Sequence, residues 1–453
     1  MADTRQIRQR ASQAPKVTDE SFDLDCLYMT LQQLVKKYDI RYDPDNPVPS
    51  DDQMADRVWA AAIDFFVNCG VYYKDTGGVL KFTRTEVLEI IADYDGDCHF
   101  GEGKEARIFR SRKPDSNSRP WCLVGSGIVA SSEDIAYKIV YGNACVEQAD
   151  FMSVCALNEI DGEPIVAGKE SEVRGAVRSL EVARKAIKDS GREGLAIING
   201  IATAASAAGT IEAARVALKP SDAIIVGSLA EFKTSDEMLR KVEYGLDSGT
   251  NIVLASAPMV GGYGGGPEAV AILNSAYALF GIMVYQCDYY LSLPLHIRYS
   301  CSTTRDVIWA MALSAQALAR NTNIPTLGLC YAAGGPWTES FYYESAAHIA
   351  ACVTSGVSIQ TPHPAKAVRT DYVTPLEMKT TTGMAMGCAG MTRKEANQVV
   401  KALLPKYEQN LATAPIGKTY TECFDLETGT AKGEYLDFVE KIKNMLSIAA
   451  MPL

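Results

Sequence analysis

Histidine is scarce in this sequence, and the cysteines never form a close pair. The 453 residues include four histidines and twelve cysteines, and no two cysteines have a Cys-x-x-Cys spacing. A metal centre built from histidines or paired thiolates is therefore not expected. Cysteines spread singly along a chain of this length are typical of reduced thiols, which indicates a cytoplasmic protein.

The sequence also lacks the patterns of membrane and nucleic-acid proteins. No run of about 20 apolar residues occurs, and the first fifteen residues are polar and basic without an apolar segment. We therefore expect neither a membrane span nor a secretory signal. The net charge is −11 and no block of lysine and arginine stands out, which argues against nucleic acid or an anionic membrane as the main partner.

The clearest local pattern that is present lies between Asp222 and Glu268. It contains an apolar strand at 222–229, an amphipathic helix at 235–244 and a second apolar strand at 251–260. A glycine-rich loop, Gly261-Gly-Tyr-Gly-Gly-Gly266, follows, and the proline after it suits the first turn of the next helix. Two parallel strands joined by a helix form one βαβ unit.

The same alternation continues over the chain from about residue 120. We predict eight strands, at 121–129, 151–156, 194–202, 223–229, 251–260, 281–287, 325–331 and 357–361. Helical patterns lie between them, at 171–190, 210–218, 235–244, 267–279, 303–319 and 337–354. This order favours the α/β class and a (β/α)8 TIM barrel. A doubly wound open sheet is the alternative, but Gly125-Ser-Gly-Ile does not complete the Gly-x-Gly-x-x-Gly that such sheets often carry.

The barrel accounts for only part of the length, so we divide the chain into three. Residues 1–119 are predicted to form an N-terminal helical layer with a small β-hairpin at about 71–82. Residues 120–374 would form the barrel, and residues 375–453 would form C-terminal helices packed on its outside. A barrel of roughly 250 residues agrees with this division.

In such barrels the functional site lies where the strands end. Carboxylates and aromatic rings are prominent among the side chains that the predicted strands and their loops place there: Asn199, Glu231, Asp288, Tyr289, Tyr290, His296, Arg298, Tyr331 and His363. Carboxylates and aromatic faces both attract ammonium groups. The sequence therefore predicts an acidic, tyrosine-rich site that suits a cationic organic substrate.

Some of these candidates also have a purely structural explanation. Glu231 could serve only to pair with Lys233. The glycine-rich loop more often marks tight turns than phosphate binding. Glu268 stands in a first helical turn, where an acid stabilises the helix dipole in any case. His296 and Arg298 alternate as in an extended segment, and could either clamp an anion or brace their loop.

Two kinds of chemistry find no support in the sequence. Cys287 and Cys330 lie near predicted strand ends, but no adjacent ligand pattern accompanies them, so zinc is not expected. No lysine stands at a strand end, which weakens a Schiff-base mechanism.

Several longer motifs resemble those of one known family. The glycine-rich loop with Pro267 and Glu268, Pro294-Leu-His-Ile-Arg298, and Gly335-Pro-Trp-Thr-Glu339 resemble the monomethylamine methyltransferase family. The resemblance runs from about residue 50 to residue 440. It implies a (β/α)8 barrel, a homohexamer, and transfer of a methyl group from a methylated amine to the cobalt of a corrinoid (cobalamin) held by a separate partner protein. This chain itself would bind no cofactor and no metal.

The resemblance is incomplete at the residue that marks the family. Its members carry pyrrolysine shortly after a Ser-Ala-x-Gly segment, which matches Ser206-Ala-Ala-Gly209 here, and the pyrrolysine position then falls at or beside Arg215. Of the family's residues around pyrrolysine, the resemblance implies that Glu231, Glu268 and Tyr331 are retained as catalytic groups. A family glutamine two residues before that tyrosine corresponds to Leu329.

We therefore predict a corrinoid-protein-dependent methyltransferase without pyrrolysine, acting on a quaternary or betaine-like methylated amine. Besides the three catalytic groups, the predicted substrate-binding residues are Arg215, Tyr263, Asp288, Tyr289, His296 and Arg298. Glu231 and Glu268 would hold the cation, and Arg215 or Arg298 would bind a substrate carboxylate. Two other hypotheses stay open, namely a barrel lyase or isomerase with Glu231 as general base and a non-catalytic protein that binds methylated amines.

Overall fold

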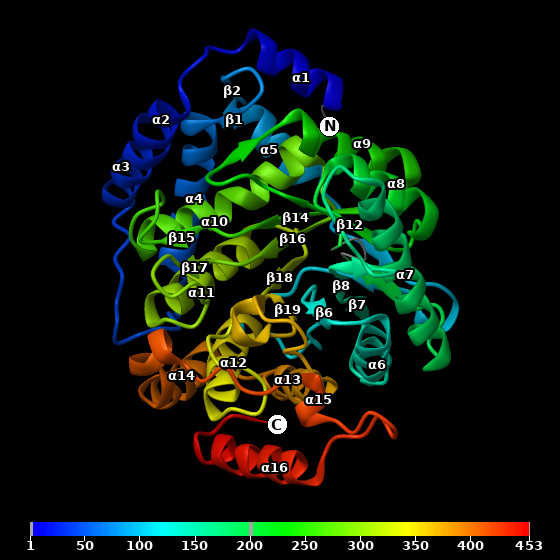
Figure 1. Cartoon of the computed structure of the whole chain (residues 1–453). Helices are drawn as coiled ribbons and strands as arrows, with labels where there is room; N and C mark the ends of the chain where they lie inside the picture. The colour runs from blue at the N-terminus through cyan, green and yellow to red at the C-terminus, as the bar shows by residue number, and fades with distance from the viewer. Residues whose placement is uncertain (1–2, 199–202, 453) are drawn as a thin grey trace.

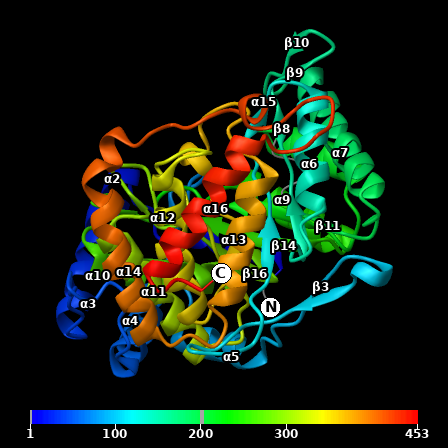
Figure 2. The ribbon, with the colours of Figure 1, turned by 90° about the horizontal axis from the view of Figure 1, so that it is seen from below.

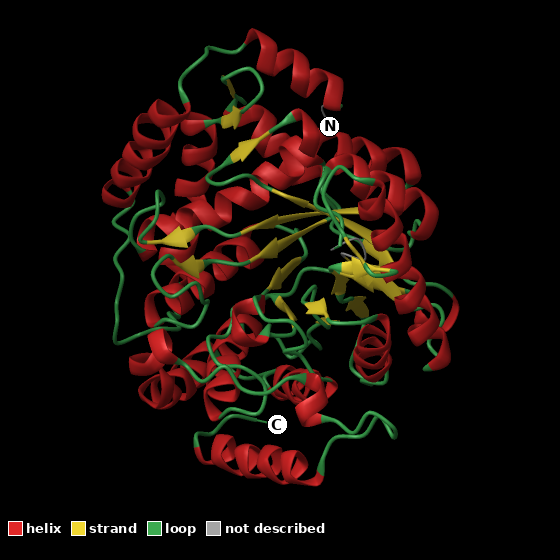
Figure 3. Ribbon diagram, in the orientation of Figure 1, coloured by secondary structure: helices red, strands yellow, loops and turns green. Residues whose placement is uncertain are grey.

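Eight short parallel strands close into a barrel at the centre of the molecule. The computed structural model describes residues 3–198 and 203–452. In order around the barrel the strands are β5 (Cys122–Val124), β7 (Phe151–Ser153), β11 (Ala196–Ile198), β12 (Ala223–Gly227), β14 (Asn251–Ser256), β16 (Tyr289–Ser292), β18 (Thr326–Gly328) and β19 (Ser358–Gln360). Every neighbouring pair is parallel, and β19 pairs back to β5 to close the ring. Figure 3 shows the strands at the centre of the molecule with helices around them. The predicted (β/α)8 barrel is confirmed.

A helix follows each barrel strand and covers the outside of the barrel (Figure 1). They are α6 (Glu133–Ala144), α7 (Glu170–Asp189), α8 (Ala207–Ala217), α9 (Asp236–Ser248), α10 (Pro267–Phe280), α11 (Arg305–Asn321), α12 (Glu339–Thr354) and α13 (Pro375–Gly387). Side-chain caps begin most of them, as Ser235 does for α9 by accepting from the Met238 amide. The pattern at 133–144 escaped the sequence prediction, and α13 completes the last β/α unit.

Short strands extend the fold beyond both ends of the barrel strands. At the carboxyl ends, β6 (Val129–Ala130) pairs with β8 (Ala156–Leu157), and β15 (Met259–Val260) pairs with β17 (Leu295–His296). Four further pairings lie outside the barrel: β9 (Glu159–Ile160) with β10 (Glu163–Pro164), β3 (Cys98–Phe100) with β4 (Arg107–Phe109), and β1 (Val71–Tyr73) with both β2 (Gly78–Leu80) and β13 (Lys233–Thr234).

The N-terminal layer packs on one side of the barrel and the C-terminal helices pack on another (Figures 1 and 2). The main N-terminal helix is α4 (Asp52–Cys69), which contacts α10 and α11. The others before the barrel are α1 (Thr4–Gln13), α2 (Asp19–Ser21), η1 (Phe22–Tyr28), α3 (Met29–Lys37), α5 (Arg84–Asp93) and η2 (Gly103–Glu105). After η4 (Pro364–Ala367) and α13 come α14 (Arg393–Tyr407), η5 (Glu408–Thr413), α15 (Tyr420–Cys423) and α16 (Gly433–Ile448).

Aromatic side chains fill the amino-terminal end of the barrel. The β3–β4 hairpin contributes Phe100 and Phe109, which lie against Phe151 and Tyr289 at the first positions of their strands. The Phe100 and Phe151 rings stack with centroids 5.1 Å apart. Together with Trp121 these residues belong to the apolar cluster inside the barrel. This end of the barrel is therefore packed solid, as is typical of the fold.

The structure corrects one predicted strand. The segment 281–287 was expected to be the sixth strand, but it continues α10 as the π-helix η3 (Gly281–Tyr285). A short apolar run can form either a buried strand or a buried helix. The sixth strand is β16, which begins two residues after Cys287. Asp288 and Tyr289, which were expected to follow strand six, therefore lie immediately before β16 and at its first position.

The helix that runs from α10 into η3 is also the most apolar in the molecule. The segment Pro267–Tyr285 is long and apolar enough to cross a membrane by length and composition, but 94% of its apolar 18-residue stretch is buried inside the protein. Twelve of the fourteen residues of α10 are buried, where it packs against α4 and α11. We read it as a core helix.

Candidate functional site

A cavity of about 480 Å³ opens at the carboxyl ends of the barrel strands. Apolar side chains that alternate into the barrel interior form its base: Ile225, Ala255, Leu291, Leu293 and Leu329. Among the described lining residues there is no aspartate or glutamate. The acidic site that the sequence predicts is therefore not what the structure assembles at this end of the barrel.

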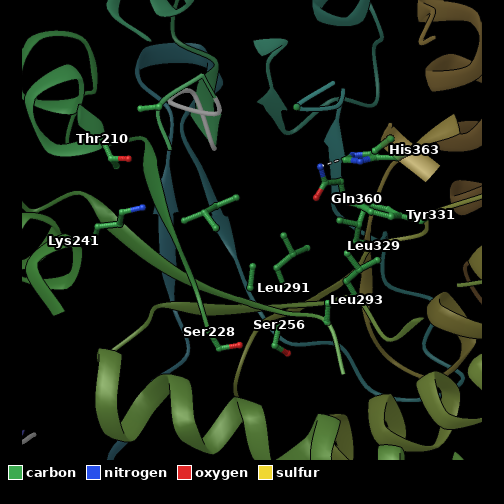
Figure 4. A pocket seen from close by; sticks show the side chains of 16 residues that line it. Thr210, Ser228, Lys241, Ser256, Leu291, Leu293, Leu329, Tyr331, Gln360 and His363 are labelled. Atoms are coloured by element: carbon green, nitrogen blue, oxygen red, sulfur yellow. Dashed lines mark hydrogen bonds between the residues drawn. The ribbon is translucent and has the colours of Figure 1, made fainter. Parts of the chain in front are cut away.

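Tyr331, Gln360 and His363 form one wall of the cavity (Figure 4). The rings of Tyr331 and His363 stack, and their backbones form a parallel bridge between the ends of β18 and β19. Gln360 Nε2 lies 3.0 Å from His363 Nε2, so the amide donates to the imidazole. Burial lowers the pKa of His363 to about 4, which keeps the ring neutral. We call these three residues the aromatic wall.

The aromatic wall has polar atoms without partners. Gln360 Oε1 is buried and has no hydrogen-bond partner in the described structure, and Figure 4 shows it turned toward the cavity. The Tyr331 hydroxyl likewise has no partner among the residues that are described, and burial raises its pKa. Buried acceptors are normally satisfied. These polar atoms are therefore available to form hydrogen bonds with a ligand that enters the cavity.

A fully buried glutamate holds the loop that carries Tyr331. Glu344 on α12 accepts from the amides of Ala333 at 2.7 Å and Gly334 at 2.8 Å. It also accepts from the hydroxyls of Thr303 and Ser340. Four donors to one carboxylate fix the loop firmly. Glu344 does not line the cavity, and we regard it as a positioning residue for Tyr331.

The opposite wall contains a lysine. Lys241 on α9 and Thr210 on α8 both line the cavity, and Figure 4 places them across from the aromatic wall. Lys241 points its amine into the cavity and has no ion pair or hydrogen bond with any described residue. Burial lowers its pKa, and the more distant Glu237 and Glu172 oppose that effect. Lys241 thus contributes the one formal charge of the described lining.

Glu231, a predicted catalytic residue, lies outside this cavity. After β12 the chain turns back, and the Leu229 and Lys233 backbones bond to each other across the turn. This turn places Glu231 near Asp23 and Lys233, with only 4% of its surface exposed. Its Oε2 has no hydrogen-bond partner in the described chain. Burial, with the Asp23 charge, raises the pKa of Glu231 to about 8.

The glycine-rich loop and Glu268 are also outside the cavity. The loop is closed by the Gly261 amide, which donates to the Gly265 carbonyl at 2.8 Å, and both glycines have positive φ. Tyr263 at its tip is 55% exposed to solvent. Glu268 accepts from the backbone amide of Tyr42 at 3.1 Å and so ties α10 to the N-terminal layer. The structural explanation fits these residues.

His296 and Arg298 brace their own loop. His296 Nδ1 accepts from the Arg298 amide at 3.1 Å, and its other ring nitrogen lies 3.8 Å from Asp306. The Arg298 guanidinium lies over the ring of Tyr299. Neither residue lines the cavity.

Asp288 and Tyr289 stand at the wrong end of the barrel for the predicted role. Asp288 precedes β16 and accepts from the amide of Ile252 at 2.6 Å, which fastens the beginning of β14. Tyr289 belongs to the aromatic filling at the amino-terminal end. Both expectations are wrong in position, because they followed from the misplaced sixth strand.

Arg215 is on the outer face of α8. Its side chain is 61% exposed and pairs with Glu212 one turn away at 2.9 Å. It is not among the lining residues of the cavity. The expectation that Arg215 contacts the substrate is therefore not supported by its position. Asn199, the predicted residue at the end of β11, lies outside the described residues.

The predicted residues and the cavity thus share Tyr331, together with His363 from the strand-end set. Sequence reasoning missed Gln360, although it is the last residue of a strand that was correctly predicted. It also missed Lys241, because a search confined to strand ends does not reach a helix that follows one. In the part of the chain that is described, no group of three or more His, Cys, Asp or Glu side chains could hold a metal ion.

Comparison with known proteins gives one consistent result. The family model "Monomethylamine methyltransferase MtmB" matches residues 3–450. A relative from Methanosarcina mazei, monomethylamine methyltransferase MtmB, is 28% identical over 441 residues, which cover 96% of this chain and 95% of that one. The relative MtmB2 from Methanosarcina acetivorans is 27% identical over the same length.

Solved structures agree in detail. The crystal structure of the Methanosarcina barkeri monomethylamine methyltransferase superimposes with a TM-score of 0.96 at 25% identity, covering 100% of this chain and 99% of that chain. The crystal structure of a hydroxylamine complex of MtmB matches with the same TM-score and identity.

Proposed function

Because this chain belongs to the monomethylamine methyltransferase family, we propose that it transfers a methyl group from a small methylated amine to the cobalt of a corrinoid protein. The reduced corrinoid on the partner would supply the nucleophile that accepts the methyl group. The cavity at the carboxyl ends of the barrel strands would hold the amine. The task of this chain is then to bind, desolvate and orient the substrate.

The observation that carries the substrate class is the lining of the cavity, in which the described residues include no carboxylate. A primary ammonium has three N–H donors, which need acceptors when they are buried. A quaternary ammonium has none, and it leaves as a neutral amine without prior protonation. Gln360 Oε1 is a buried acceptor without a partner in the described lining, but no carboxylate stands beside it to accept the other N–H groups of a methylammonium. On this basis the cavity favours a quaternary methylammonium group over methylamine itself.

Residues of the aromatic wall would orient this group. The face of Tyr331 offers a cation–π contact, and the stacked His363 ring extends the aromatic surface beside it. Leu291, Leu293 and Leu329 would exclude water from the methyl groups. An apolar site also disfavours the charged amine relative to a neutral product, which promotes methyl loss.

The proposal requires no pyrrolysine. The resemblance places the family's pyrrolysine position at or beside Arg215, and Arg215 lies on the outer face of α8. No imine is then present to bind methylamine covalently. A quaternary substrate makes such a group unnecessary, because the neutral amine that it releases is already a good leaving group.

We further propose a homo-oligomer, by analogy with the family, and a corrinoid-binding protein as the partner. All twelve cysteines are free in the described chain, which agrees with a reducing, cytoplasmic setting. Nothing in the net charge of −11 favours nucleic acid or an anionic membrane.

The decisive experiment mixes the purified protein with reduced corrinoid protein and a panel of methylated amines. We expect quaternary amines to convert the absorption of reduced cobalt to that of the methylated form, and methylamine to react poorly. Brisk turnover of methylamine would contradict the substrate assignment. Saturable binding of quaternary amines without any methylation would favour the non-catalytic binding protein.

A lyase or isomerase with Glu231 as general base is the less supported alternative. A general base must come within hydrogen-bond reach of the substrate, and Glu231 is buried outside the cavity beside Lys233 and Asp23.

A further inference from the structure

We propose that Lys241 binds a carboxylate of the substrate, so that the natural substrate is a quaternary ammonium carboxylate of the betaine class. This inference rests on the proposed function and specifies its substrate. The expected carboxylate ligands from the sequence, Arg215 and Arg298, do not line the cavity, whereas Lys241 does.

The amine of Lys241 is unused by the protein. It points into the cavity from α9 and has no ion-pair or hydrogen-bond partner among the described residues. Lysines are almost never fully buried without a partner, and burying an unpaired charge costs free energy. An anionic group that enters the cavity would supply the missing partner.

The nearest carboxylates are occupied elsewhere. Glu237 accepts from the amide of Ala207 at the beginning of α8, at 2.8 Å. Glu172 accepts from the amides of Gly168, Ala205 and Ser206 and from the Ser206 hydroxyl, all within 2.8 Å. Neither is within ion-pair distance of Lys241. Both carboxylates have structural roles at the start of α8.

The charge of the described lining selects for an anion. Lys241 is its one formal positive charge, because burial keeps His363 neutral, and no described carboxylate balances it. Burial lowers the pKa of Lys241. A bound carboxylate would counter this effect by stabilising the charged amine. Binding of the anion is thus favoured by the unpaired charge of Lys241.

A hydroxyl beside the lysine adds a second donor. Thr210 on α8 lines the same wall, and its side chain has no hydrogen-bond partner among the described residues. A carboxylate accepts from an ammonium and a hydroxyl at once. We therefore assign Lys241 and Thr210 together as the anion-binding end of the cavity.

The two walls then match the two ends of a zwitterion. The aromatic wall suits the quaternary nitrogen, and the wall of Lys241 and Thr210 suits the carboxylate, with apolar side chains between them (Figure 4). The volume of about 480 Å³ is ample for such a molecule and far exceeds the needs of methylamine. A substrate that spans both walls would present its methyl groups in one orientation.

The test compares ligands with and without a carboxylate on the unmodified enzyme and on two variants. Trimethylglycine and its homologues with longer spacers are the carboxylate probes, and tetramethylammonium and choline are the carboxylate-free ones. Lys241→Met keeps the length and removes the charge. Arg240→Met is the matched control, because Arg240 precedes Lys241 on α9 but is exposed and pairs with Asp236 outside the cavity.

Binding is measured by calorimetry on the enzyme alone, and methyl transfer is measured with reduced corrinoid protein. We expect Lys241→Met to weaken binding of the best carboxylate probe by roughly 10- to 150-fold, the loss of one charge-assisted contact. Binding of tetramethylammonium should change less than about threefold, and Arg240→Met should match the unmodified enzyme with every probe.

The outcomes separate this inference from the proposed function. The carboxylate-binding role of Lys241 is called the anchor. If carboxylate and carboxylate-free probes bind equally and Lys241→Met changes the affinity for neither, the anchor is overturned, even when methyl transfer to the corrinoid occurs. If binding of the carboxylate probes depends on Lys241 but no probe is demethylated, the anchor stands and the methyltransferase proposal fails. Equal losses in Lys241→Met and Arg240→Met would also overturn the anchor, because the effect would then be one of surface charge.

Discussion

The rings of Tyr331 and His363 stack with their centroids 5.4 Å apart and their planes 21° from parallel. The contact joins two neighbouring barrel strands just beyond their carboxyl ends, where their backbones also form a bridge. An aromatic face held this rigidly costs little further entropy when a ligand packs on it.

Replacing Tyr331 distinguishes a cation–π contact from simple burial. Tyr331→Phe keeps the ring and should alter the affinity for a quaternary amine less than about threefold. Tyr331→Leu keeps an apolar side chain without the ring quadrupole, and should weaken binding by about 2- to 30-fold. Titration calorimetry with tetramethylammonium measures both. Equal affinities of the Phe and Leu variants would show that the ring face does not bind the cation.

Leu329 marks a position where the resemblance predicts a glutamine. Leu329→Gln would bury an amide beside the apolar side chains of Leu291 and Leu293. We expect the free energy of unfolding to fall by about 1–3 kcal/mol and the affinity for quaternary amines to fall with it. Leu329→Met is the control, because it keeps the cavity apolar. Tighter binding of quaternary amines by the glutamine variant would contradict this account.

Glu344 should act on activity through the Tyr331 loop. In Glu344→Gln one oxygen becomes an NH2 group that faces backbone donors, so we expect a loss of about 1.5–3 kcal/mol in stability and a reduced rate of methyl transfer. Asp288→Asn is the matched comparison, because Asp288 also accepts from a backbone amide but at the opposite end of the barrel.

The paired variants are compared by denaturant unfolding and by steady-state kinetics below the melting range. Asp288→Asn should lower stability and leave the kinetics of the folded protein unchanged. If Glu344→Gln behaved in the same way, Glu344 would have no positioning role.

Glu231 should make stability depend on pH. Its pKa is raised from 4.5 to about 8 in the folded protein, so between these values the folded state keeps a proton that the unfolded state releases. The stabilisation from this proton is complete below about pH 4.5 and is lost as the pH rises to about 8, by at most about 1.4 kcal/mol per pH unit.

Glu231→Gln removes this titration. We expect the melting temperature of the variant to exceed that of the unmodified protein increasingly from pH 5 to pH 8, and methyl transfer to be unchanged. Calorimetric melting over that range measures the first, and the corrinoid assay measures the second. A large loss of turnover in Glu231→Gln would return this residue to the catalytic machinery.

The barrel could be predicted from sequence because strand and helix patterns alternate so regularly. Seven of the eight predicted strands contain a barrel strand, usually shorter than expected. The prediction of the sixth strand was wrong, because 281–287 is as apolar as a buried strand yet continues the preceding helix as η3. Local pattern does not tell a buried helix from a buried strand at this length.

The site was predicted less well, for two physical reasons. The sixth strand was predicted at 281–287 instead of at β16, so Asp288 and Tyr289 were expected at the carboxyl end of the barrel but lie at its amino-terminal end. Glu231 does follow a strand, but it lies in the bonded turn from Leu229 to Lys233 and is not among the residues that line the cavity. Tyr331 was placed correctly because its strand and the following loop both lie as the pattern indicates.

The aromatic filling at the amino-terminal end of the barrel has a kinetic consequence. With Phe100, Phe109 and Phe151 packed inside that end, the cavity is a blind well that is reached from the opposite face. On the proposed function, the corrinoid protein must approach through that same opening. The small substrate should then enter first, and its demethylated product should leave only after the partner has departed. Inhibition of the reaction by excess corrinoid protein, relieved by raising the amine concentration, is the expected sign of this compulsory order.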